Sequence, residues 1–324
     1  MLIGNAILTL WILISVAIFT SHSYTLFSTV ILISIFYVVL LLLLYASYIT
    51  DKKYRKIELC FSEYALSNWF VFIIFIVYGV WILLVKIALN ASSINIKIFL
   101  GANLILIIFV IFLYKNNLMY LYFLKRARPL EDKKLLNRIK NLQRKMGIGE
   151  VELYILQGKR MKVANAYQVG TKNYAVFLYD YLLENLNSDE ILAVIAHEFA
   201  HIKLKHTARL QIISFLYLFY MLNASLFLIH IRAQKHYSVA LFILTLLIVL
   251  SLFLLPVVLS FILRRFEREA DLLAVANLEN KEWMITALEK LSDINNIPKK
   301  LSRFAAGTHP SIHKRIEYIK NYRG

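Results

Sequence analysis

The stretch ILAVIAHEFAHI, residues 191–202, is the most informative segment of this chain. Its polar residues are His197, Glu198 and His201, and Ser188 stands three residues ahead of it as a helix-capping residue. Residues four apart share one face of a helix, so the two imidazoles can hold one metal ion. The sequence therefore predicts a helix from Ser188 onward that carries a zinc site, with one Zn²⁺ per chain.

The chemistry expected of this pattern is peptide hydrolysis. A zinc ion on His197 and His201 would lower the pKa of a water molecule and polarise a carbonyl group. Glu198 would take the proton of that water as general base and return it to the leaving amine. The competing interpretation is a structural histidine pair on a helix, with no metal.

A catalytic zinc site of this kind needs a third protein ligand. Metzincins take it from a glycine and histidine pattern after the helix, but Leu204 and Thr207 stand at those positions. His206 is offset from His197 by about 180° on a continuous ideal helix, so it cannot easily share the same zinc. We favour a polar residue at a membrane edge over a metal ligand at this position.

The better candidate for the third ligand is Glu267, in the segment RRFEREAD, residues 264–271. Asp271 shares its helical face, so one of the two can bind metal while the other accepts a hydrogen bond from a ligand imidazole. Glu269 lies about 200° from Glu267 on a helix, so only one of these glutamates can face the histidines. We favour Glu267, with Asp271 as its orienting partner.

Composition predicts a mainly α-helical integral membrane protein. Of the 324 residues, 60% are hydrophobic and 18% charged, and the mean hydropathy is +0.63. A membrane helix needs about 20 mostly apolar residues. The sequence contains six such candidates, at residues 3–20, 24–49, 65–89, 98–114, 211–231 and 238–263.

Charge predicts a multi-pass cell-membrane protein with both termini and the catalytic residues on the cytoplasmic side. The segments 52–56 and 125–145 are rich in Lys and Arg, and an even number of spans separates them, whereas the loops 21–23 and 90–97 are nearly uncharged. Loop 232–237 is a mild exception. The net charge of +17 would also suit nucleic acid, but its basic residues cluster beside apolar runs, so we expect a lipid bilayer and no nucleic acid as partner. Cys60, the single cysteine, excludes an internal disulfide.

The polar remainder predicts a catalytic domain in two pieces. We expect a four-span membrane region at 1–124, a first catalytic part at 125–210, a two-span hairpin at 211–263 and a second catalytic part at 264–324. The first part should begin with a basic helix reaching residue 145 and contain strands at 151–156, 163–169 and 174–179 in a small antiparallel sheet. Helices are expected at 282–294 and 311–322. With the HExxH helix, this predicts a zincin-like α+β domain interrupted by a transmembrane hairpin.

Four motifs in order make the chain resemble the HtpX-like and type I CAAX prenyl protease group of membrane gluzincins. They are Asn165-Ala166-Tyr167, His197 to His201 followed by His206, Glu267 to Asp271, and Thr308-His309-Pro310 with Arg315. The resemblance implies zinc on His197, His201 and Glu267, with Glu198 as base and Asp271 behind the ligands. It also implies His309 near the reacting carbonyl, Arg315 close to Asp271, and residues 165–167 as a strand for the substrate.

The resemblance leaves the substrate open, because Ser311 replaces a second proline that is common in the group and the four leading spans match neither branch. The first expectation is a zinc metalloendopeptidase that cleaves membrane proteins or precursor peptides at the cytoplasmic face. One alternative is a signal-transducing metallopeptidase of the beta-lactam-receptor type, which predicts an extracellular sensor. Another is an inactive membrane scaffold or transporter. Neither specificity nor oligomeric state is indicated.

Overall fold

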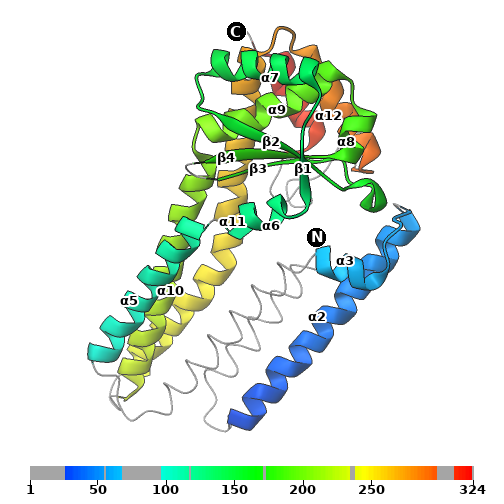
Figure 1. The fold of residues 1–324 in the computed structure, drawn as a ribbon. Coiled ribbons are helices and arrows are strands. Elements are labelled where there is room, and N and C mark those ends of the chain that lie inside the picture. Colours follow the sequence, from blue (N-terminus) through cyan, green and yellow to red (C-terminus); the bar gives the residue numbers. More distant parts are fainter. Residues whose placement is uncertain are drawn as a thin grey trace. The chain divides into compact units, whose positions relative to one another are not determined.

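The computed structural model describes residues 26–54, 56–67, 96–116, 118–170, 173–233, 238–297 and 310–322 (Figure 1). In chain order, its elements are α2 (Leu26–Tyr54), α3 (Phe61–Ser67), α5 (Ile96–Asn116), α6 (Leu118–Leu124), β1 (Ala127–Pro129), α7 (Lys133–Met146), β2 (Val151–Leu156), the 3₁₀ turn η1 (Lys159–Met161), β3 (Ala166–Val169), β4 (Tyr174–Tyr179), α8 (Asp180–Asn185), α9 (Ser188–Lys203), α10 (His206–Ala233), α11 (Ser238–Asn277), α12 (Glu282–Ile294) and α13 (Ile312–Lys320).

The chain divides into two compact units. One comprises residues 1–54, 59–112 and 214–257, and the other residues 55–58, 113–213 and 258–324. In the first unit, α5 is almost wholly apolar, and an amide pair joins it to α10: Asn103 of α5 and Asn223 of α10 each donate to the other's side-chain oxygen at 2.9 Å. Such pairing satisfies polar groups that would otherwise be costly among apolar side chains.

The predicted membrane spans are not confirmed. Within the described ranges, no helix is both long enough and apolar enough to cross a membrane. The predicted span at 3–20 lies outside the described residues, and so does most of the span at 65–89.

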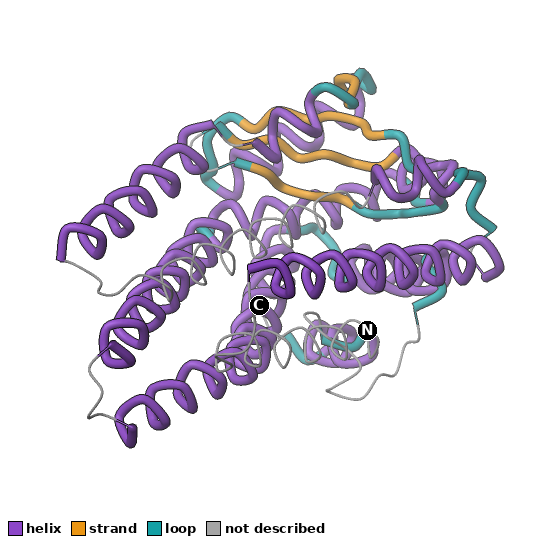
Figure 2. Tube along the Cα trace, turned by 90° about the horizontal axis from the view of Figure 1, so that it is seen from below, coloured by secondary structure: helices purple, strands orange, loops and turns teal. Residues whose placement is uncertain are grey.

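The second unit contains a four-stranded sheet in the order β1-β2-β4-β3, drawn in orange in Figure 2. β1 pairs with β2 and β3 with β4 in antiparallel fashion, but β2 and β4 are parallel. The predicted all-antiparallel sheet is therefore wrong. The expected basic helix also differs, because residues 127–129 form β1 and α7 begins only at Lys133, capped by the Asp132 side chain.

The connection after β2 explains the mixed sheet. Asp180, directly after β4, accepts hydrogen bonds from the N–H groups of Gly158 (2.7 Å) and Lys159 (3.0 Å). These bonds hold the chain that leaves β2 against the end of β4. β2 and β4 are therefore neighbours in the sheet, and β3 pairs with the other edge of β4. Only glycine fits at position 158, because an added Cβ would lie 2.6 Å from Tyr179 Cδ1.

Alternate residues of β4 belong to two cores on the two faces of the sheet. Val176 and Leu178 join the main core, which includes α9 with α7 and α12 packed against it. Ala175 and Phe177 join a smaller cluster on the other face, where Phe123 packs. Phe123 belongs to α6, which lies on that side of the sheet in Figure 1. Because both faces are covered, β4 is a nearly continuous apolar run.

Helix α9 has a sharply defined start and end. A capping box forms at its start, one residue earlier than expected: Asn187 accepts from the N–H groups of Asp189 and Glu190, and Glu190 accepts from the Asn187 N–H at 2.9 Å. The helix ends at Lys203, and Lys205 has a left-handed backbone with φ 55°. A new helix, α10, therefore begins at His206 in a different direction.

Candidate metal centre

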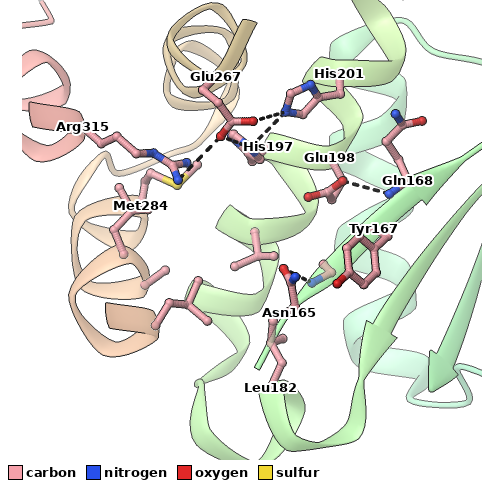
Figure 3. A pocket seen from close by; sticks show the side chains of 15 residues that line it. Asn165, Tyr167, Gln168, Leu182, His197, Glu198, His201, Glu267, Met284 and Arg315 are labelled. Atoms are coloured by element: carbon pink, nitrogen blue, oxygen red, sulfur yellow. Dashed lines mark hydrogen bonds and ion pairs between the residues drawn. The ribbon is translucent and has the colours of Figure 1, made fainter. Parts of the chain in front are cut away.

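Three potential ligands converge between α9 and α11 (Figure 3). The Nε2 atoms of His197 and His201 are 3.1 Å apart, and they lie 3.6 and 3.5 Å from the two carboxylate oxygens of Glu267. One donor atom from each residue lies within 4.8 Å of the others. Two imidazole nitrogens and one carboxylate are a typical donor set for catalytic zinc, so these residues fit such an ion.

Both α9 histidines reach the centre because the motif spacing matches the helix. His197 and His201 are one turn apart on α9, where His197 is buried and His201 partly buried. Glu267 is 8% exposed and lies on α11. This helix runs without a break through residues 264–271, the segment predicted to hold the third ligand. The structure thus places Glu267, and not Glu269, against the two Nε2 atoms.

Behind His197 lies a buried ionic cluster. Asp271, which is fully buried, approaches His197 Nδ1 at 2.9 Å. Arg315 of α13 donates to both oxygens of that carboxylate, at 2.8 Å through Nε and at 2.6 Å through a terminal nitrogen. Tyr318, one turn further along α13, donates to it as well. Arg315 therefore lies beside Asp271, as the resemblance implied.

Charges in this cluster shift the pKa values in opposite directions. Burial opposes ionisation of Asp271, but Arg315 and His197 outweigh it and hold the pKa of that carboxyl well below its ordinary value. Burial likewise lowers the pKa of His197, but the Asp271 and Glu267 carboxylates overcome that effect and raise it to about 10. The carboxylates therefore favour a hydrogen on His197 Nδ1, and they hold the His197 ring in one orientation.

Glu198 lines a cavity together with His197, His201 and Glu267. Its Oε2 accepts a hydrogen bond from the backbone N–H of Gln168 at 3.0 Å (Figure 3). Burial is the main cause that raises the pKa of Glu198 above its ordinary value. Gln168 was not among the residues expected from the sequence, and a backbone donor leaves no side-chain signal by which to find it.

The cavity has a volume of about 340 Å³ and two different walls. One wall carries the histidines, Glu198, Glu267 and Arg315, and the other is apolar. The apolar wall is made by residues of α8, α9 and α12: Leu182, Val194, Met284, Ala287, Leu288 and Leu291.

Residues Asn165 to Tyr167 line the cavity at the edge of the sheet. The Asn165 side chain accepts from the Ala166 N–H at 2.9 Å, and Tyr167 stacks on Phe123 with ring centroids 5.9 Å apart. Ala164, the residue before Asn165, is anchored by Asn295, the residue that caps the end of α12. The Asn295 side chain accepts from the Ala164 N–H and donates to the Ala164 carbonyl oxygen. His309, the remaining expected site residue, lies outside the described residues.

His206 contradicts the expectation of a polar residue at a membrane edge. It is 1% exposed, and its Nδ1 lies 2.9 Å from Nδ1 of His201. Burial lowers the pKa of His206 to about 4, so this imidazole is neutral near pH 7. The angular argument assumed one continuous helix, whereas the turn at Lys205 brings His206 back beside His201. Its conclusion that His206 does not share the metal of His197 is not contradicted, because the three converging donors are His197, His201 and Glu267. No glycine or proline marks that turn in the sequence.

Comparison with known proteins gives consistent matches. The profile of "Peptidase family M48" matches residues 129–323. A "CAAX prenyl protease 1 homolog" from Arabidopsis thaliana is 40% identical over 95 residues, 27% of this chain and 22% of that protein. A "Protease HtpX homolog" from Helicobacter pylori is 31% identical over 190 residues, 53% of this chain and 60% of that protein.

Among solved structures, S. mikatae Ste24p matches with a TM-score of 0.49 and 21% identity, over 66% of this chain and 58% of that one. This chain therefore spans less than two thirds of the length of each of these proteins.

Proposed function

The chain belongs to peptidase family M48, and we propose that it is a zinc metalloendopeptidase that hydrolyses peptide bonds. One observation carries the proposal: His197, His201 and Glu267 bring their donor atoms within 4.8 Å, and Glu198 lines the same cavity. A structural histidine pair would need neither the third ligand nor an adjacent carboxylate that faces open space.

In the proposed mechanism His197, His201 and Glu267 hold the metal. A bound zinc ion supplies Lewis acidity, which polarises the scissile carbonyl and makes water acidic enough to react near neutral pH. Glu198 takes one proton from that water as its oxygen bonds to the carbonyl carbon. The carboxyl then passes the proton to the amide nitrogen as the C–N bond breaks.

The substrate is proposed to lie along the outer edge of β3. This strand is at the edge of the sheet, and residues 165–168 line the cavity. An extended peptide can pair with such an edge through its backbone, which holds it with little dependence on sequence. Opposite the edge, the wall that includes Ala287 and Leu288 offers space for an apolar side chain. His309 is proposed, from the family resemblance, to act near the reacting carbonyl.

We further propose that the protein lies in a membrane, with both termini and the metal centre on the cytoplasmic side. Support comes from the six apolar segments of the sequence and its mean hydropathy of +0.63. Large apolar side chains are also exposed along α2, α5, α10 and α11, among them Leu42, Ile105, Leu216 and Leu250. Exposed apolar surface of this extent marks contact with lipid or protein. Membrane proteins and precursor peptides are then the proposed substrates.

Cysteine labelling tests this topology. In a Cys60→Ser background, a cysteine at Asn173 should be protected from an impermeant thiol reagent in intact cells, while one at Ser93 should be labelled. The reverse pattern would overturn the proposed orientation.

The catalytic proposal is tested with purified full-length protein by measuring zinc content and cleavage of an unfolded, fluorescently labelled protein. Glu198→Gln should keep its zinc and lose most cleavage, because the substitution removes the base but no ligand. Glu289→Gln, an exposed glutamate of α12, is the matched control and should behave like wild type. Wild-type protein without zinc or cleavage would refute the proposal, and unchanged cleavage by zinc-loaded Glu198→Gln would refute the assigned base.

A further inference from the structure

We propose that His206 and Glu269 form an arm that orients the metal ligand His201, as Asp271 does for His197. The inference rests on the metal site proposed above and assigns two positioning residues to it. Neither residue touches the place where the donor atoms converge. Each acts through its neighbour, so the arm connects α10 and α11 to a ligand of α9.

Geometry defines the arm as a chain of contacts. His201 Nδ1 lies 2.9 Å from His206 Nδ1, and His206 Nε2 lies 3.3 Å from Glu269 Oε2. Glu269 is fixed in turn by Arg265, whose Nε donates to its other oxygen at 2.8 Å. The His206 ring lies flat on Phe266, with centroids 4.1 Å apart and planes 5° from parallel. The imidazole is thus held at both nitrogens and on one face.

One arrangement of protons satisfies all of these contacts. His201 directs Nε2 toward Glu267 and the other imidazole, so a metal there takes the Nε2 lone pair and the ring hydrogen must sit on Nδ1. That N–H donates to His206 Nδ1, which must accept. His206 then carries its hydrogen on Nε2 and donates it to the Glu269 carboxylate. The arm therefore fixes both the tautomer and the orientation of His201.

The spacing along α11 explains why a second imidazole is needed. Asp271 is one turn after Glu267, so it shares that face and reaches His197 directly at 2.9 Å. Glu269 points about 200° away from Glu267 and cannot reach His201 alone. His206 bridges that gap. Three carboxylates of one helix segment thus serve the site, one as a candidate ligand and two behind the imidazoles.

Two other roles for His206 fit less well. A fourth metal ligand would need a free nitrogen directed at the other donors, but both ring nitrogens are engaged with His201 and Glu269. A simple core residue would not need a carboxylate partner, and its packing on Phe266 could be supplied by any aromatic ring.

Paired substitutions separate hydrogen bonding from packing. His206→Phe keeps a ring over Phe266 but removes both hydrogen bonds, whereas His206→Gln keeps an acceptor for His201 and a donor for Glu269. We expect the Phe variant to bind zinc about 10- to 100-fold more weakly than wild type, the range typical of outer partners of metal-binding histidines. His206→Gln should recover most of that loss, and Glu269→Ala should weaken binding in the same direction.

The measurement is zinc affinity of the full-length protein by competition with a chromophoric chelator, together with the visible absorption bands of the cobalt-substituted protein. His313→Ala, an exposed histidine of α13, is the matched control. Shifted cobalt bands in His206→Phe and restored bands in His206→Gln are expected. Wild-type affinity and spectrum in His206→Phe would overturn the inference, and so would a Gln variant as impaired as the Phe variant. Wild-type protein that binds no zinc would instead refute the proposed function itself.

Discussion

Arg315→Met should destabilise the protein strongly although it removes no metal ligand. Asp271 is fully buried, and Arg315 makes two charge-assisted hydrogen bonds to it. Methionine is close in length but carries no charge, so the variant leaves a buried carboxylate without its cation. Removing one partner of a buried ion pair costs about 3–5 kcal/mol.

That cost is a large fraction of ordinary protein stability, which is about 5–15 kcal/mol. At roughly 2–4 °C per kcal/mol, the midpoint of thermal unfolding should fall by about 6–20 °C. The assay is thermal unfolding of zinc-loaded protein in detergent, followed by intrinsic fluorescence. A midpoint within about 2 °C of wild type would refute the buried ion pair.

The double variant Asp271→Asn with Arg315→Met provides the control. Both charges are then absent, so the penalty for an unpaired buried charge disappears and stability should recover much of the loss. The introduced amide would be a weaker acceptor for His197 than the carboxylate of Asp271, so zinc affinity should stay below that of wild type. Equal stability of the single and double variants would show that packing, and not charge, accounts for the loss.

Three further predictions concern the base, the cavity and the sheet. In the metal-free protein, burial raises the pKa of Glu198, so the carboxyl band that Glu198→Gln removes from infrared difference spectra should titrate above the ordinary 4.5; titration at or below 4.5 would contradict this. Ala287→Leu narrows the cavity, so KM for substrates with large apolar side chains should rise several-fold at unchanged zinc content. Gly158→Ala places a Cβ against Tyr179 and should cost about 1–3 kcal/mol in chemical denaturation, whereas Gly149→Ala, with open space, should cost far less.

Local patterns predicted the elements of the second unit well. β2, β4 and α12 begin and end where the sequence analysis placed them, because alternation and capping are encoded within each segment. The four-residue spacings also indicated which side chains could meet, and the structure brings His197, His201 and Glu267 together. Helix geometry gave only the shared faces; that Glu267 meets the two histidines was expected from the need for a third ligand and from the family resemblance.

Sheet order could not be read in the same way. Strands 151–156 and 174–179 looked like members of a meander, but their partners depend on Asp180, which bonds the chain more than twenty residues upstream. The donors are the backbone N–H groups of Gly158 and Lys159, and backbone groups leave no pattern in a sequence. The short β1 was missed for a similar reason, because three residues pair with β2 inside a segment whose charge resembled a helix.

His206 illustrates a different failure. The angular argument was sound for a continuous helix, but a single left-handed residue, Lys205, resets the direction of the chain. Lysine has no particular preference for that conformation, so the sequence carries no warning there. The same break brings His206 into contact with His201, which the angular argument did not anticipate.

The convergence of α9 and α11 also has a consequence for the entropy of the unfolded chain. A metal ion that joins His201 to Glu267 closes a loop of about 65 residues, and a cross-link of that span restricts the unfolded chain by about 4 kcal/mol in the loop-entropy description of a disulfide. The ion would then stabilise the fold as well as take part in catalysis. Chelation should therefore lower the free energy of unfolding, while Asp271 stays buried beside Arg315 in the metal-free protein.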